Sequence, residues 1–175
     1  MNITLPDGSI RELDLGSTGL DLASSIGPGL AKAAIAVTVN GVQRDLSDPI
    51  NEDSSVSIIT IDSDDGLEIM RHTLTAQVLA RAVKNLYPGT KLAIGPTITD
   101  GFYYDFEFKK PISPEDLESI EKEMKKIIAG NSSITKSFHT KEEAINVFRN
   151  EGESYKESIV SDSQQEDNFQ LYTQD

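Results

Sequence analysis

The amino-acid sequence predicts an α+β protein made of two small domains. Its 175 residues provide room for one ordinary domain or two small ones. Short alternating apolar runs typical of strands fill the first third of the chain, whereas longer helical patterns dominate the remainder. An acidic stretch that ends in glycine, residues 62–66, separates the two patterns. We therefore predict a first domain over residues 1–62 and a second over residues 66–175.

The first domain begins with a predicted β-hairpin and a short helix. Apolar runs flank Pro6-Asp7-Gly8, and such a triplet supplies turn geometry. Apolar residues spaced three apart then predict a helix over residues 20–26, with its apolar stripe facing the sheet. Gly27 is expected to end this helix as a left-handed cap.

Further strands complete the first domain. Alternating apolar residues over 35–39 lead into Asn40-Gly41, the strongest short hairpin signal because both central residues must take positive φ. A last alternating run covers residues 56–61. A hairpin, one helix and short strands predict a small mixed sheet crossed by a helix, the β-grasp (ubiquitin-like) arrangement. Periodicity alone leaves several topologies open.

The second domain begins with a predicted long helix. Residues 67–87 contain neither glycine nor proline and are followed by Pro88-Gly89, which cannot continue a helix. Extended segments over residues 92–98 and 101–108 come next. We expect these two segments to form an antiparallel pair.

Capping signals indicate two more helices. Ser113, followed by proline and two acids, predicts a helix start, and Gly130 is expected to end that helix. Its expected buried face consists of Leu117, Ile120, Met124 and Ile127. Thr140 begins a sequence with capping-box spacing, and the helix that follows is expected to stop near Gly152. The polar, acidic stretch at 161–167 is expected to be a loop.

Composition and charge limit the classes of function. The formal net charge of −13 argues against non-specific attraction to nucleic acid, DNA included, because phosphate binding normally rests on clustered lysine and arginine. With no cysteine and only two histidines, the chain cannot build a disulfide or a conventional zinc site. No apolar run approaches about 18 residues and no signal peptide is visible, so we expect no membrane partner and a cytoplasmic location.

Three stretches of the sequence form an ordered set. They are Ile26 to Ala36 with Val39-Asn40-Gly41, then Gly66 to His72 with Ala93 to Pro96 and Asp100 to Phe106, and finally Gly152 to Lys156. Together they resemble the amino-terminal region of the bacterial threonyl-tRNA synthetase family, over essentially the whole chain. The resemblance implies a β-grasp TGS domain at 1–62 and, at 66–175, an editing domain that is incomplete at its carboxyl-terminal end.

The resemblance also implies a role in protein biosynthesis. The family's editing domain hydrolyses serine from mischarged threonine tRNA, a task that arises because a site accepting threonine cannot fully exclude its smaller relative. The implied partner is the acceptor end of tRNA(Thr), bound together with the rest of a synthetase that is expected to be a homodimer. ATP and zinc are expected only in the family's catalytic domain, which these residues do not include. We therefore expect no cofactor and no aminoacylation by this chain alone.

The family's editing pocket resembles a constellation of two motifs, His-x-x-x-His on a helix and Cys-x-x-x-His further along the chain. His72 matches the first histidine and is expected to orient the ester or an attacking water. Gln77 stands where the second histidine is expected, with one extra residue between them. Glutamine forms hydrogen bonds but does not exchange a proton near neutral pH, so Gln77 is expected to bind substrate at most. The alternatives without a function are that His72 is an ordinary histidine at the helix entry and that Gln77 is a solvated helix residue. The downstream motif would follow residue 175.

Three more residues are candidate site residues by the same resemblance. Lys156 matches the family's pocket lysine, and a cation there could bind the tRNA terminus or stabilise charge that develops on the ester. The competing interpretation is a surface lysine. Tyr104 and Asp105 are candidate pocket-lining residues, although an alternating aromatic strand is more often part of a core. His139 is assigned no chemistry, and we expect no metal site.

Two hypotheses of function remain open from the sequence. In the first, the chain is the amino-terminal part of a threonine–tRNA ligase with a degenerate editing domain. In the second, it is a freestanding, non-catalytic module that binds tRNA or a synthetase. Loss of the second histidine favours loss of editing, whereas the resemblance over the whole length favours an origin in a synthetase.

Overall fold

The computed structural model describes residues 1–174, which divide into two compact units, residues 1–70 and residues 71 onward. Helix α3 (Asp64–Thr73) runs across this division. The stretch at 62–66 is therefore only in part a loop, because its second half forms the first turn of α3. The domain limits 1–62 and 66–175 stay predictions.

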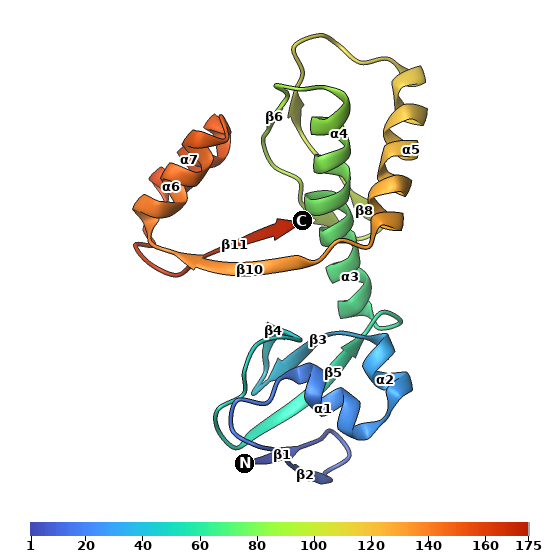
Figure 1. Cartoon of the computed structure of the whole chain (residues 1–175), viewed down its shortest axis with the longest axis vertical. Helices are drawn as coiled ribbons and strands as arrows, with labels where there is room; N and C mark the ends of the chain where they lie inside the picture. The colour runs from blue at the N-terminus through green and yellow to red at the C-terminus, as the bar shows by residue number, and fades with distance from the viewer. Residues whose placement is uncertain (175) are drawn as a thin grey trace. The chain divides into compact units, whose positions relative to one another are not determined.

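A five-stranded mixed sheet forms the centre of the first unit (Figure 1). Its strands are β1 (Asn2–Thr4), β2 (Ile10–Glu12), β3 (Ala34–Val39), β4 (Val42–Asp45) and β5 (Ser54–Thr60). The strand order is β2-β1-β5-β3-β4, in which β1 and β5 are parallel and the other pairs are antiparallel. Helices α1 (Gly19–Ile26) and α2 (Pro28–Ala33) follow the first hairpin. This mixed sheet with a crossing helix confirms the predicted β-grasp arrangement.

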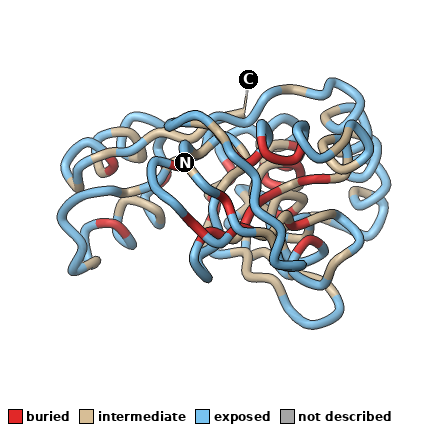
Figure 2. Tube along the Cα trace, turned by 90° about the horizontal axis from the view of Figure 1, so that it is seen from below, coloured by how far each residue is buried: buried red, intermediate tan, exposed pale blue. Residues whose placement is uncertain are grey.

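The core of the first unit lies between the sheet and α1. Its fully buried side chains are Ile3, Leu22, Val37, Val39, Ile50 and Val56. Helix and sheet are in close contact, because a Cβ atom added to Gly19 would lie 2.5 Å from Cγ1 of Val37. Buried residues form short stretches along the trace rather than long continuous runs, as expected for alternating strands and amphipathic helices (Figure 2).

Both predicted turns of the first unit are confirmed. Gly8 has a φ of 82°, and the hairpin at Asn40-Gly41 has φ values of 49° and 82°. The prediction for Gly27 is wrong, because its φ of 168° is extended rather than left-handed. The reason is that Pro28 begins α2 at once, so Gly27 serves as the N-terminal flanking residue of a second helix.

The long helix predicted over 67–87 is present as one helical run with a π-helical segment in its middle. The run comprises α3, η1 (Leu74–Leu79) and α4 (Ala80–Leu86). The backbone N–H of Ala80 donates to the carbonyl of Thr75, five residues earlier, instead of to the fourth. The segment therefore holds one more residue than an α-helix of the same length.

The predicted antiparallel pair is confirmed, but it is interrupted. Strand β6 (Lys91–Leu92) pairs with β9 (Phe106–Glu107), and β7 (Thr97–Ile98) pairs with β8 (Gly101–Phe102). Helix α5 (Pro114–Gly130) begins with a capping box between Ser113 and Asp116 and packs beside α4 (Figure 1). Leu117 does not belong to the buried face, since it is 58% exposed.

The remainder of the second unit consists of two helices and a two-stranded ribbon. Helix α6 (Lys141–Asn150) confirms the predicted capping box at Thr140, and Gly152 follows its end with a φ of 72°. Helix α7 (Ser154–Asp162) and the ribbon of β10 (Ile134–His139) with β11 (Phe169–Gln174) were not predicted. Within residues 1–174, no helix is long and apolar enough to span a membrane.

Candidate functional site

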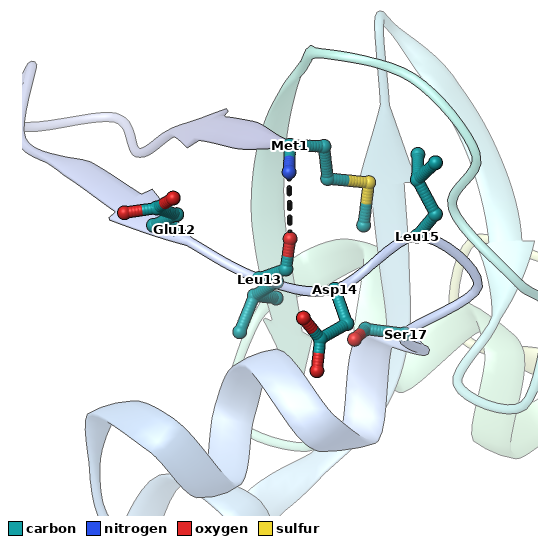
Figure 3. Close-up of a pocket in the computed structure, with 6 residues that line it drawn as sticks. All are labelled: Met1, Glu12, Leu13, Asp14, Leu15 and Ser17. Atoms are coloured by element: carbon teal, nitrogen blue, oxygen red, sulfur yellow. Dashed lines mark hydrogen bonds between the residues drawn. The ribbon is translucent and has the colours of Figure 1, made fainter.

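A hollow of about 640 Å³ lies on the first unit, beside the start of the chain (Figure 3). Its walls are Met1, Glu12, Leu13, Asp14, Leu15 and Ser17. The terminal ammonium of Met1 donates a hydrogen bond of 2.7 Å to the carbonyl oxygen of Leu13, which fixes one wall (Figure 3). The hollow contains no nucleophile paired with a base. All residues that the sequence nominated belong to the second unit instead.

The most unusual side chain of the second unit is that of Glu153. It is 2% exposed and is the only ionisable side chain among the described residues that is buried. Its Oε1 atom forms an ion pair with Nζ of Lys84 on α4. Its Oε2 atom accepts a hydrogen bond of 3.1 Å from the backbone N–H of Leu92 on β6. A buried carboxylate is stable only when it is paired in this way.

Lys156 lies one helical turn further along α7 and is half-buried. Its Nζ atom is 5.6 Å from the ring centroid of Phe148 on α6, within the range of a cation–π contact. Burial lowers the pKa of Lys156, while the carboxylates of Glu153 and Glu151 act in the opposite direction and the ammonium of Lys84 lowers it again. The site thus combines a partly desolvated cation with a buried anion nearby.

Tyr104 belongs to the same electrostatic cluster. Burial raises the pKa of its hydroxyl group, and the charge of Glu153 raises it further, so the hydroxyl stays protonated and able to donate. The ring contacts Phe106 with centroids 4.5 Å apart. A Cβ atom added to Gly95 would lie 2.4 Å from Cδ2 of Tyr104 and 2.8 Å from Cγ2 of Thr75. Gly95 therefore lets the Tyr104 ring lie against the π-helical segment.

The helical run carries the other two nominated residues. His72 is exposed near the end of α3, and Gln77 is half-buried in η1. The five-residue hydrogen bonding of η1, in which Gln77 lies, accommodates one added residue within the helical run, whereas His72 precedes the segment in α3. Arg71, in the last turn of α3, ties this run to the turn between β7 and β8, because its Nη1 atom donates a hydrogen bond of 2.7 Å to the carbonyl oxygen of Thr99.

Asp105 takes part in the structure through its backbone. Its N–H donates to the carbonyl of Ile94 at 2.9 Å, and its carbonyl accepts from the N–H of Ala93 at 3.1 Å. Its side chain is exposed. His139, which was assigned no chemistry, lies on β10 with its Nε2 atom 2.8 Å from Oγ of Ser137.

The charge of Glu153 thus acts on both Tyr104 and Lys156. Within residues 1–174, no hydrogen bond or ion pair joins the side chain of His72, Gln77 or Asp105 to these residues. Sequence reasoning missed Glu153 and Lys84. A charged residue directly after a helix-ending glycine was the available signal for Glu153, because such a position is fixed by its backbone. No signal in the sequence identified Lys84, since lysine in the last turn of a helix is common.

The cluster offers hydrogen-bond donors and a positive charge, but no nucleophile. An ammonium and a tyrosine hydroxyl suit an anionic or carbonyl oxygen, as found in esters and phosphates. Among residues 1–174, no group of three or more His, Asp or Glu side chains is arranged to hold a metal ion. Any water that attacks an ester here needs a base from elsewhere, and His72 on the helical run is the candidate that the sequence offers.

Comparison with known proteins assigns the family of this chain. Residues 1–60 match the model of the TGS domain. The threonine–tRNA ligase of Gluconobacter oxydans is 45% identical over 172 residues, which are 98% of this chain and 26% of that enzyme. The ligase of Rhodospirillum rubrum is 46% identical over 98% of this chain and 27% of the enzyme, and that of Burkholderia lata is 44% identical over 99% and 27%.

The chain spans about a quarter of the length of these curated relatives. The match covers both units, because it includes almost every residue of the chain. With a TGS domain at residues 1–60 and about 45% identity along its whole length, this chain corresponds to the amino-terminal region of the enzymes of the threonine–tRNA ligase family.

Proposed function

We propose that the chain is the amino-terminal part of a cytoplasmic threonine–tRNA ligase and that its second unit takes part in hydrolytic editing of Ser-tRNA(Thr). The observation that carries this proposal is the half-buried Lys156 beside the buried Glu153 and the protonated Tyr104, in a chain that is homologous to these ligases. The bound partner is the acceptor end of tRNA(Thr), held mainly by the rest of a homodimeric synthetase. ATP and zinc serve that remaining part alone.

In the proposed reaction, water attacks the carbonyl carbon of the seryl ester. Negative charge then develops on the carbonyl oxygen, and a preorganised cation and hydroxyl donor stabilise that charge best in a site shielded from water. Lys156 and Tyr104 supply these two donors. His72 orients the attacking water and accepts its proton, because an imidazole nitrogen can act as a general base.

Gln77 and Asp105 have binding roles in this proposal. The carboxamide of Gln77 offers one acceptor and two donors for the hydroxyl or amino group of the seryl moiety, but it does not relay a proton. The exposed carboxylate of Asp105 would attract the ammonium group of the amino acid. A site with one imidazole in place of two is expected to hydrolyse more slowly than a site with both.

The second candidate function is a non-catalytic module that binds tRNA or a synthetase. The presence of Gln77 where the family has a histidine favours it, because binding survives this replacement while proton transfer does not. The reading frame beyond codon 175 separates the two hypotheses. A frame that continues into a Cys-x-x-x-His motif and a ligase catalytic domain would contradict the freestanding module.

The deciding experiment is deacylation of Ser-tRNA(Thr) by this chain and by the protein of the complete reading frame, with Thr-tRNA(Thr) as the control substrate. The variants are His72→Ala and Lys156→Ala, and Lys122→Ala is the matched control because Lys122 is an exposed lysine on α5. Selective hydrolysis of the seryl ester, lost in the first two variants and kept in the third, would support editing. No hydrolysis above background by either protein would contradict editing, and the non-catalytic binding module would remain as the candidate function.

A further inference from the structure

Glu153 has a role that its position in the sequence does not explain. It occupies the N-cap position of α7, yet its side chain forms no capping hydrogen bond. Its backbone is held on the other side, where its N–H donates 2.9 Å to the carbonyl of Phe148. The carboxylate instead extends away from its own helix to Lys84 and to the N–H of Leu92. Burial of the Glu153 carboxylate away from its own helix costs desolvation free energy, so it implies a function or a tight structural requirement.

The two partners of Glu153 come from separate elements. Lys84 lies in the last turn of α4, and Leu92 lies on β6, which pairs with β9 on its other side. The carboxylate thus takes the place of a neighbouring strand for one amide of β6 and, at the same time, pairs with the end of α4. A second contact fastens the same helix to β9, because the hydroxyl of Tyr155 donates to a carboxylate oxygen of Glu107. The first turn of α7 is therefore held at two points.

Lys156 belongs to this fixed turn but is not bonded to the carboxylate. Each oxygen of Glu153 already accepts one hydrogen bond, from Lys84 and from Leu92. Among the described residues, no hydrogen bond or ion pair joins Lys156 to Glu153, and the Lys156 ammonium lies over the ring of Phe148. The charges that act on this ammonium are those of Glu153, Glu151 and Lys84.

We propose that Glu153 is a positioning residue for Lys156: its carboxylate, held by Lys84 and the Leu92 amide, fixes the first turn of α7 and attracts the Lys156 ammonium without binding it. The ammonium then remains free for an oxygen of the substrate. Lys84 is part of this arrangement, because it occupies the carboxylate oxygen that Lys156 would otherwise take. The inference rests on the proposed editing function and assigns two residues to it.

Two substitutions test this arrangement because they act on Lys156 in opposite directions. Glu153→Gln keeps the shape and an acceptor for the Leu92 amide but removes the negative charge, so the pKa of Lys156 is expected to fall. Lys84→Met keeps the aliphatic stem and frees one oxygen of Glu153, so Lys156 is expected to pair with the carboxylate and its pKa to rise. Lys122→Met, on the exposed face of α5, is the matched control with no expected change.

The pKa of Lys156 is measured by NMR on the chain with lysine labelled at Cε, and the signal is assigned with Lys156→Arg. Amide spectra of each variant show whether the fold is kept. Deacylation of Ser-tRNA(Thr) is followed in parallel across pH, and both variants are expected to lower kcat on the order of 10–100-fold because the ammonium is displaced or captured. Because the loss of either charge by itself shifts the pKa of Lys156 in these directions, a crystal structure of Lys84→Met decides whether the Lys156 ammonium has moved onto the freed oxygen of Glu153, which a merely structural role of Glu153 would not produce.

The outcomes separate this inference from the proposed function. Opposite pKa shifts together with lower kcat would support both. Movement of the Lys156 ammonium onto Glu153 in Lys84→Met, in a protein that does not hydrolyse the ester, would support the positioning of Lys156 and contradict editing. An unchanged pKa of Lys156 in folded Lys84→Met or Glu153→Gln protein would overturn the inference, whether or not the wild-type protein edits.

Discussion

The hydroxyl group of Tyr87 donates a hydrogen bond of 2.8 Å to Oδ1 of Asp116, which joins the end of α4 to the start of α5. Asp116 also accepts hydrogen bonds from the backbone N–H and the hydroxyl of Ser113, at 2.7 and 3.0 Å. One carboxylate thus caps a helix and links it to its neighbour. Hydrogen bonds from Ser113 and Tyr87 hold the pKa of Asp116 below its ordinary value of 3.8.

This low pKa predicts an acid-dependent loss of stability. A carboxyl group with a lower pKa in the folded state stabilises the fold at pH values above its ordinary pKa, and this stabilisation is lost as the pH falls through the folded-state value. Asp116→Asn should therefore lower the melting temperature at neutral pH and flatten its decline below about pH 4. Melting is followed by circular dichroism, with Glu118→Gln, an exposed acid on α5, as the control. An equally steep acid decline in Asp116→Asn would contradict this account.

Substitution of Gly95 should destabilise the second unit. A Cβ atom there would lie 2.4 Å from Tyr104 and 2.8 Å from Thr75, distances that force side chains or backbone to move. Gly95→Ala is expected to cost about 1–3 kcal/mol of unfolding free energy. Denaturant unfolding gives this value, and Gly101→Ala is the matched control, since a Cβ at Gly101 meets no atom within 4 Å. Equal losses in the two variants would show that the Tyr104 contact is not the cause.

The π-helical segment should tolerate the loss of one residue. Deleting Leu74 is expected to convert η1 into α-helix while both flanks keep their faces, because the segment holds one residue too many for an α-helix. The deletion should leave the melting temperature unchanged or raise it. Amide NMR reports whether the Ala80 to Thr75 hydrogen bond is replaced. A deletion of Leu79 cannot serve as the control, because Leu79 also lies in η1. The control is therefore a deletion of Leu86, which lies outside the segment. A large drop in melting temperature only for the Leu74 deletion would refute the compensation.

Substitutions of Asn40 should show how much the left-handed backbone of this hairpin contributes to the free energy of unfolding. Asn40 has a φ of 49°, and its side chain accepts 2.9 Å from the N–H of Ser55 and donates 3.3 Å to Oγ of Ser54. Asn40→Ala is expected to cost about 1–2 kcal/mol, since alanine rarely adopts positive φ. Asn40→Gly removes the same side-chain bonds but keeps the backbone accessible, so it should cost less. Denaturant unfolding of both variants measures the difference, and equal costs would assign the effect to the side chain.

Several residues of the candidate site could be predicted from the sequence, but the contacts around Glu153 could not. Tyr104 and Lys156 were named through the resemblance, and the charge of Glu153 acts on both of them. Glu153 lies in one of the three stretches that carry the resemblance, but it was assigned no role, and Lys84 was not predicted as a site residue. Their pairing joins residues 69 positions apart, which no local pattern reports. The same holds for Gly95, whose partners Tyr104 and Thr75 come from different elements.

The sequence by itself determined the hairpin turn at Asn40-Gly41, the capping boxes that begin α5 and α6, and the family of the chain. The turn and the capping boxes follow from the backbone preferences and hydrogen bonds of a few neighbouring residues, so a short stretch specifies them, whereas the family follows from similarity along the whole chain. Only the tertiary structure decided that Leu117 is exposed and that Glu153 is buried as a charge. Burial depends on what packs against a residue from distant parts of the chain, and the sum of those contacts overrides the local pattern.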